Sequence, residues 1–202
     1  MSRAKTKSER AYGSRRTDGP KVSKGSIPLT VSRPELLSGG TDRDFRRLVH
    51  NMFAFMARHE AVRDGHARHI GLAGVEYTTL ISIGHLGLEG DVNVKTVADH
   101  LHMSGAFVTT VTSKLQTLGL IQKTQDNIDR RRISLAITEK GKELLRRLAP
   151  YQREINDVEF ACLTKEQFHL LSTIMENLID CGDKAVALQR YKLTIKDDSK
   201  VA

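Results

Sequence analysis

Three consecutive arginines, Arg130, Arg131 and Arg132, follow Asp129 in a segment with turn-forming residues. A guanidinium group binds phosphate strongly and is attracted to the narrow, negative minor groove of A/T-rich DNA. Asp129 can orient one of these arginines through an ion pair. The run therefore predicts contact with a polyanion, and an ordinary solvated turn is the alternative interpretation.

A second candidate surface consists of small hydroxylated residues at helical spacing. Such residues let a helix enter the major groove, where hydroxyls contact phosphates or base edges and methyl groups contact thymine methyls. The set has no Arg or Asn to form paired hydrogen bonds with guanine or adenine, so we expect specificity to depend on apolar contacts, water and DNA shape. A solvated helix surface is the alternative. The predicted DNA-contacting residues here are Lys95, Ser104, Ala106, Phe107, Thr109, Thr110, Ser113 and Lys114.

Other reactive residues favour no catalytic chemistry. His59, His66 and His69 lie near Glu60 and Asp64, and such ligands suit zinc, but their spacing matches no ligand motif. We interpret them as polar loop or pocket residues and predict neither metal nor cofactor. Cys162 and Cys181 can sense oxidation or simply pack, and packing is favoured for Cys162 because it lies on an apolar seam. The sequence contains no glycine-rich phosphate loop, nucleophile elbow or paired catalytic carboxylates, so an enzyme is the least supported class.

The positive charge is concentrated near the N-terminus. The 202 residues include 32 Lys and Arg against 24 Asp and Glu, a net charge of +8. Residues 1–35 hold nine of the basic and three of the acidic side chains, or +6, which leaves +2 for the other 167 residues. This composition predicts a basic, mostly disordered extension over residues 1–40, with residues 25–40 as an arm able to dock. The excess charge favours a nucleic-acid partner, although a tail that only aids solubility is the alternative.

The sequence has neither an apolar run long enough for a membrane helix nor a signal peptide, and this bears on where in the cell the protein is expected. No apolar run approaches the roughly 18 residues of a membrane helix, and the basic N-terminus is not followed by an apolar signal segment. Two cysteines cannot form a disulfide framework. We therefore expect a cytoplasmic protein without membrane contact.

The elements that must hold these residues follow from periodicity. Residues 41–91 are predicted to form N-terminal helices: one begins at a Thr41-Asp42 cap and another covers 74–86, with a loop or irregular helix end over 63–74. The apolar stripe of the first helix comprises Phe45, Leu48, Val49, Met52, Phe53 and Met56.

Residues 92–141 are predicted to form a winged helix-turn-helix. A short helix over 94–101 leads to Ser104, a good N-cap, and to a helix that ends at Gly119. The buried stripe of the second helix is predicted to be Val108, Val111, Leu115 and Leu118. Strands over 120–124 and 133–137 then form the hairpin that carries the arginines at its tip. The expected fold class is mainly α with a small β-wing, flanked by long N- and C-terminal helices.

Residues 142–190 are predicted to form C-terminal helices that pair with another long helix. Thr138 caps a helix with an apolar heptad seam and a kink at Pro150, and Thr164 to Gln167 form a capping box for a final helix. Residues 191–202 are polar and expected to be frayed.

This order of elements resembles the MarR family of bacterial regulators over residues 42–188. The most specific matches are the segments Ala98–Ser104, Lys114–Ile121, Asp129–Arg131 and Ile137–Gly141. The resemblance implies a homodimer in which the helices of residues 41–91 and 142–190 are the N- and C-terminal dimerisation helices. It also implies binding to a pseudo-palindromic operator in double-stranded DNA, usually as a repressor released by a small ligand. It also implies an effector pocket near Phe53, His59, His69 and Tyr77. The 40-residue extension departs from the family pattern. A ligand-independent architectural protein and a winged helix used only for protein contacts remain the alternatives.

Overall fold

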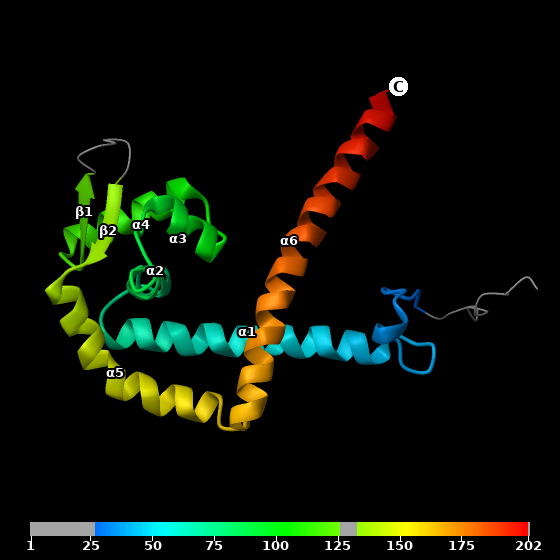
Figure 1. The fold of residues 1–202 in the computed structure, drawn as a ribbon, viewed down its shortest axis with the longest axis horizontal. Coiled ribbons are helices and arrows are strands. Elements are labelled where there is room, and N and C mark those ends of the chain that lie inside the picture. The colour runs from blue at the N-terminus through cyan, green and yellow to red at the C-terminus, as the bar shows by residue number, and fades with distance from the viewer. Residues whose placement is uncertain (1–26, 126–132, 202) are drawn as a thin grey trace, which may run out of the picture. The chain divides into compact units, whose positions relative to one another are not determined.

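The computed structural model describes residues 27–125 and 133–201 and is mainly helical (Figure 1). The chain divides into two units, Met1–Glu60 and Ala61–Ala202. A two-stranded sheet accompanies the helices, which confirms the predicted fold class. The elements in order are η1 (Pro34–Leu36), α1 (Arg43–His69), α2 (Gly74–Leu86), α3 (Val94–Leu101), α4 (Gly105–Thr117), β1 (Ile121–Gln125), β2 (Ile133–Ile137), α5 (Glu139–Glu159) and α6 (Lys165–Val201).

The arm before α1 is docked on the start of that helix. The backbone N–H and the hydroxyl of Thr30 both donate to Asp42 Oδ2 at 2.7 Å, and Arg46 donates to the Pro28 carbonyl at 2.6 Å. Hydrogen bonds from Arg46 and Thr30 hold the pKa of the buried Asp42 carboxyl well below its usual value. Asp42 therefore begins the helix through its backbone carbonyl, which accepts from Arg46 N, while its side chain anchors the arm.

Helix α1 is longer than the sequence pattern suggested. The segment predicted as a loop or irregular end is helical through His69, and the break is confined to residues 70–73. Gly71, at φ +73°, ends the helix, with Leu72 N bonded to the Ala67 carbonyl at 2.9 Å. The sequence pattern did not indicate a helix here, because its two buried positions are the polar residue His66 and the small residue Ala67 instead of large apolar residues.

The apolar stripe of α1 is largely solvent-accessible in the single chain. Leu48 is 55% exposed, Phe53 64% and Met56 62%. A soluble chain rarely leaves so many large apolar side chains along one helix uncovered.

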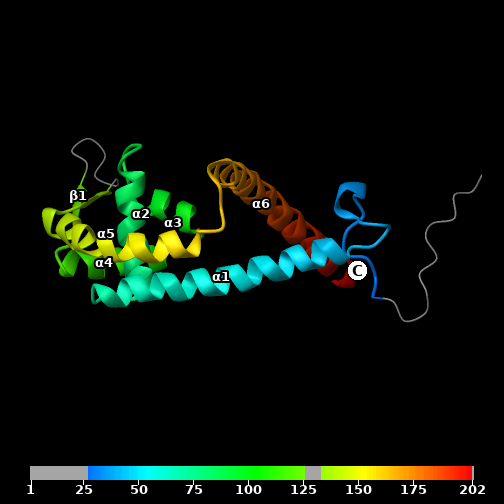
Figure 2. The same cartoon turned by 90° about the horizontal axis from the view of Figure 1, so that it is seen from below.

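In the second unit, α2, α3 and α4 lie together beside β1 and β2 (Figure 1 and Figure 2). The strands pair antiparallel, from Ile121 opposite Ile137 to Gln125 opposite Ile133. The first strand begins at Ile121, one residue later than predicted. The segment between α2 and α3 joins the sheet at β2, where Leu135 N donates to the Val92 carbonyl at 2.7 Å. Fully buried core residues include Leu80, Ile83, Val97, Val108, Leu115, Ile121 and Leu148.

Local capping signals place the C-terminal helices as predicted. Thr138 Oγ1 accepts from Gly141 N at 3.1 Å at the start of α5, and Thr164 with Gln167 forms the reciprocal capping box before α6. Pro150 lies inside α5, and Figure 1 shows that helix bending along its length.

Two features of the C-terminal part differ from the prediction. Helix α6 is longer than expected, and the side chain of Cys162 is more exposed than expected. The helix continues to Val201 through the segment predicted to be frayed, because no Gly or Pro interrupts residues 192–201. Every side chain from Thr164 to Ile195 is exposed. Cys162, predicted to pack, is exposed because it lies in the turn after α5. No helix in the described ranges is long and apolar enough to cross a membrane.

Candidate nucleic-acid interface

Helix α4 is the candidate recognition helix, and its first turn is fixed by Ser104. Phe107 N donates to Ser104 Oγ at 3.3 Å, which confirms the predicted N-cap. Val108, Val111 and Leu115 are buried as predicted, but Leu118 is 37% exposed because it is the C-cap residue after the last turn. Thr112 takes the remaining buried position, with its hydroxyl donating to the Thr109 carbonyl at 3.1 Å. Sequence reasoning missed Thr112 because a threonine in this helix resembles the solvated residues.

The opposite face of α4 carries the predicted hydroxyl groups, and their protons are already used. Thr109 and Ser113 donate to carbonyls one turn earlier at 2.8 Å, and Thr110 does so at 3.2 Å. Such back-bonding leaves oxygen lone pairs and methyl groups free for other contacts. Ala106 and Phe107 add exposed apolar surface beside them. The face therefore offers acceptors and apolar groups.

Three lysines of the helix-turn-helix and β1 have different partners. Lys95 forms an exposed ion pair with Asp99 at 2.6 Å, which raises the lysine pKa. Lys114 instead pairs with Glu76, whose side chain is only 7% exposed. Lys123 was missed by sequence reasoning; it extends from β1 to donate to Ser113 Oγ at 3.0 Å, and burial lowers its pKa. The alternation of side chains along β1 puts Lys123 on the same face as Ile121, and this pattern could have indicated that Lys123 lies beside α4.

The wing itself is described only at its base. Strands β1 and β2 bring the hairpin next to α4. Asp129, Arg130, Arg131 and Arg132 lie outside the described residues, so their contact with DNA stays a prediction.

The segment after the wing holds the end of the recognition helix. Thr138 Oγ1 donates to the Gly119 carbonyl at 2.7 Å, and Lys140 Nζ donates to the Leu118 carbonyl at 2.7 Å. We call these two side chains the α4–α5 clasp. A cationic group at a helix C-terminus also complements the helix dipole. The Ile137–Gly141 motif thus has a structural role, since two of its side chains hydrogen-bond the C-terminal end of α4 to the start of α5.

The predicted effector residues fall in both units. Phe53 is exposed and His59 lies at stacking distance from Phe55, with ring centroids 5.9 Å apart. In the second unit, His69 stacks on Tyr151 at 4.1 Å, and buried Tyr77 accepts a hydrogen bond from Gln152 Nε2 at 2.9 Å.

Buried His66 joins His69 and Tyr77 into one cluster. Its ring contacts Tyr77 and Tyr151 edge-on, and its Nε2 lies 3.1 Å from Asn156 Oδ1. The sequence did not single out Tyr151 for this cluster, because it lies on α5, far away in the chain. A hollow of about 360 Å³ lies beside these rings, lined by His69, Ile70, Leu144 and Arg147.

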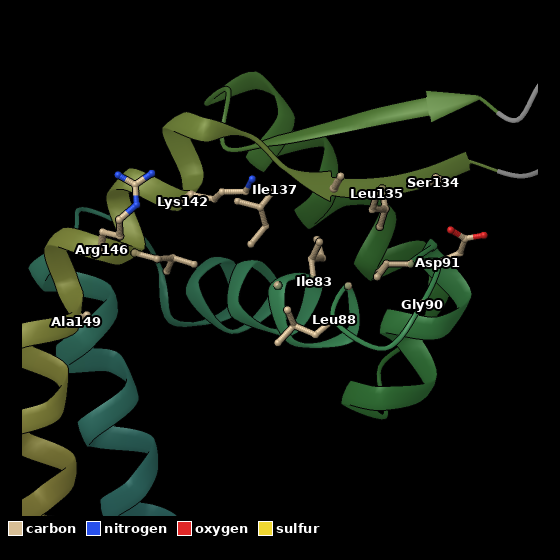
Figure 3. Close-up of a pocket in the computed structure, with 15 residues that line it drawn as sticks. Ile83, Leu88, Gly90, Asp91, Ser134, Leu135, Ile137, Lys142, Arg146 and Ala149 are labelled. Carbon is tan, nitrogen blue, oxygen red and sulfur yellow. The ribbon is translucent and has the colours of Figure 1, made fainter.

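A larger groove of about 790 Å³ lies between the end of α2, β2 and the start of α5 (Figure 3). Its walls include Ile83, Leu135 and Ile137, with Lys142 and Arg146 at one edge. Both cations are paired with acidic residues of their own helix, so their charge is largely neutralised. None of the DNA-contacting or effector residues predicted from the sequence lines this groove.

Within the described ranges, no group of three His, Cys, Asp or Glu side chains is arranged to hold a metal ion. His59, His66 and His69 thus do not assemble into a described metal site.

The fold and this interface define a winged helix-turn-helix protein. No model of a known protein family matches the chain. The HTH-type transcriptional regulator SarZ of Staphylococcus saprophyticus is 26% identical over 98 residues, so the match spans 48% of this chain and 66% of that relative. Similar solved structures include a mutant MarR from E. coli complexed with operator DNA, at 12% identity and TM-score 0.54, covering 67% of this chain and 94% of that one. Another is Bordetella bronchiseptica BpsR, whose DNA binding is regulated by 6-hydroxynicotinic acid, at 19% identity and TM-score 0.54, covering 65% and 91%.

The chain has the fold of the MarR-family transcriptional regulators, which further solved members of that family share. The resemblance noted from sequence is therefore confirmed at the level of the fold.

Proposed function

We propose that the protein is a homodimeric transcriptional repressor that binds a pseudo-palindromic operator and is released by a small aromatic or anionic ligand. The observation that carries the proposal is the exposed hydroxyl and apolar face of α4, capped by Ser104 and placed beside the wing. A face of this kind fits the major groove, and the wing arginines would enter the adjacent minor groove. A similar fold complexed with operator DNA supports this assignment. Such a regulator acts beside its DNA, in the cytoplasm.

The dimer is supported by apolar surface that a single chain leaves exposed. Leu48, Phe53 and Met56 of α1 are more than half exposed, and Leu171, Ile174 and Leu178 of α6 between 39% and 44%. Burial of such side chains is worth about 1.5–3 kcal/mol each. A second copy would cover both helices and would present two recognition helices to two half-sites.

The ligand is assigned to the cluster around His69 and Tyr77. The adjoining hollow of about 360 Å³ has the size of a small-molecule site, and His69 with Arg147 suits a compact acid. A similar fold regulated by 6-hydroxynicotinic acid supports this class of ligand.

A mobility-shift titration on the upstream region of the protein's own gene tests the proposal. We expect a discrete complex on this DNA in excess of unrelated competitor, and release by one or more aromatic acids. Equal binding to all duplexes, unaffected by any acid, would instead favour an architectural role. No binding at low salt would favour a protein-contact module.

A further inference from the structure

The first turn of α2 contacts three other helices through three consecutive residues. Glu76 pairs with Lys114 of α4, Tyr77 accepts from Gln152 of α5, and Thr78 accepts a hydrogen bond from an arginine of α1. Because these side chains belong to one helical turn, they move together. The position of α4 is thereby linked to the aromatic cluster at Tyr77.

Glu76 is the most constrained member of this turn. The residue is 6% exposed, its Oε2 accepts from Ala73 N at 3.0 Å, and its Oε1 pairs with Lys114 Nζ. Burial raises the pKa of Glu76, but the hydrogen bonds from Lys114 and Ala73 and the lysine charge outweigh it, so the pKa is lowered. The carboxylate is therefore ionised at neutral pH and depends on Lys114 for its countercharge.

This dependence restricts what Lys114 can do on DNA. If Lys114 Nζ moved to a phosphate, it would leave a buried carboxylate without its cation, which is strongly unfavourable. Lys95 provides the contrast, because its partner Asp99 has a side chain that is 65% exposed and can be solvated by water. The two lysines were both predicted to contact DNA, yet only Lys95 is easily released.

We propose that Glu76 is a positioning residue for DNA recognition, which fixes α4 to the first turn of α2 and holds Lys114 away from the phosphate backbone. The inference rests on the proposed function, since it concerns how the recognition helix is presented. It assigns Lys114 to the support of α4 and removes it from the phosphate contacts.

Anisotropy titrations of the full-length protein test this role. The probes are a labelled duplex from the upstream region of its gene and an unrelated duplex of equal length, across a series of NaCl concentrations. For Lys114→Met, we expect the salt slope to stay unchanged while the preference for the upstream duplex falls about fivefold, a loss near that of one hydrogen bond. For Glu76→Gln, we expect the same loss of preference but a slope steeper by about one, because the released lysine reaches a phosphate.

Matched controls come from an exposed ion pair on α5. Glu139 and Lys142 are 2.7 Å apart, with side chains 78% and 55% exposed. Glu139→Gln and Lys142→Met should leave preference and slope unchanged. Circular dichroism melting verifies that each variant folds. Glu76→Gln is the safer substitution, because it leaves no buried charge without its cation, whereas Lys114→Met does.

A slope that becomes shallower by about one in Lys114→Met would overturn the proposal, because it would show a phosphate contact. Unchanged preference in Glu76→Gln would overturn it as well. Failure of the proposed function looks different, since the wild-type protein would then not distinguish the two duplexes at all.

Discussion

Thr138, one of the two residues of the α4–α5 clasp, gives a prediction about stability that can be worked from its two side-chain hydrogen bonds. Thr138 Oγ1 accepts from Gly141 N at 3.1 Å, which caps α5, and donates to the Gly119 carbonyl at 2.7 Å. Loss of a helix N-cap costs about 1 kcal/mol, and loss of a further hydrogen bond costs about 1 kcal/mol. Thr138→Val keeps the shape of the side chain but removes both bonds. We expect the free energy of unfolding to fall by about 2 kcal/mol.

Thr164→Val provides the matched control. Thr164 Oγ1 accepts from Gln167 N at 3.2 Å, so this substitution removes a cap alone. It should cost about 1 kcal/mol, and Thr138→Ser should cost little because serine retains the hydroxyl.

Thermal melting by circular dichroism at one fixed protein concentration measures these differences. For a chain of this size, about 2 kcal/mol lowers the melting temperature by roughly 4–8 °C, against roughly 2–4 °C for the control. Equal melting temperatures for Thr138→Val and Thr164→Val would show that the bond to Gly119 adds no stability. A Thr138→Ser variant that melts as low as Thr138→Val would show that the hydroxyl is not the stabilising group.

Further predictions concern the helix junction, the arm, the wing and the tail. Gly141→Ala should lower stability by about 1–3 kcal/mol, because an added Cβ would overlap the Leu120 carbonyl; denaturant unfolding measures this loss, and full stability would show that the junction can open. Asp42→Asn should free the arm and accelerate its cleavage by trypsin several-fold. Since the folded-state pKa of Asp42 is lowered, the native contact should persist from neutral pH to about pH 4 and be lost only as the pH falls further; an early change in the Thr30 amide resonance would argue against it. Arg130→Ala should make the salt slope of DNA binding shallower by about one, and an unchanged slope would exclude a phosphate contact. Deletion of residues 1–35 should weaken binding at low salt without altering operator preference, whereas lost preference would assign recognition to the tail.

Short-range signals in the sequence predicted much of the fold. The caps at Ser104, Thr138 and Thr164 each depend on residues three positions apart, and all three form as expected. Alternation of apolar residues located both strands to within one residue. These features were accessible because their energetics are local.

Contacts between distant residues were not accessible in this way. Nothing in the periodicity indicates that Lys114 pairs with Glu76, or that Tyr151 stacks on His69. The helical end of α1 was hidden for the same reason, because buried His66 looks polar in sequence and becomes a core residue only when α5 supplies Asn156.

The most direct test of the central claim is DNase footprinting of the full-length protein on the upstream region of its gene. A dimer that presents two recognition helices should protect one pseudo-palindromic site whose half-sites are about 10 base pairs apart, or a multiple of that spacing. Salt at about 0.2 M should weaken the footprint without moving it. Uniform coating of the fragment, or no protection at low salt, would contradict the account.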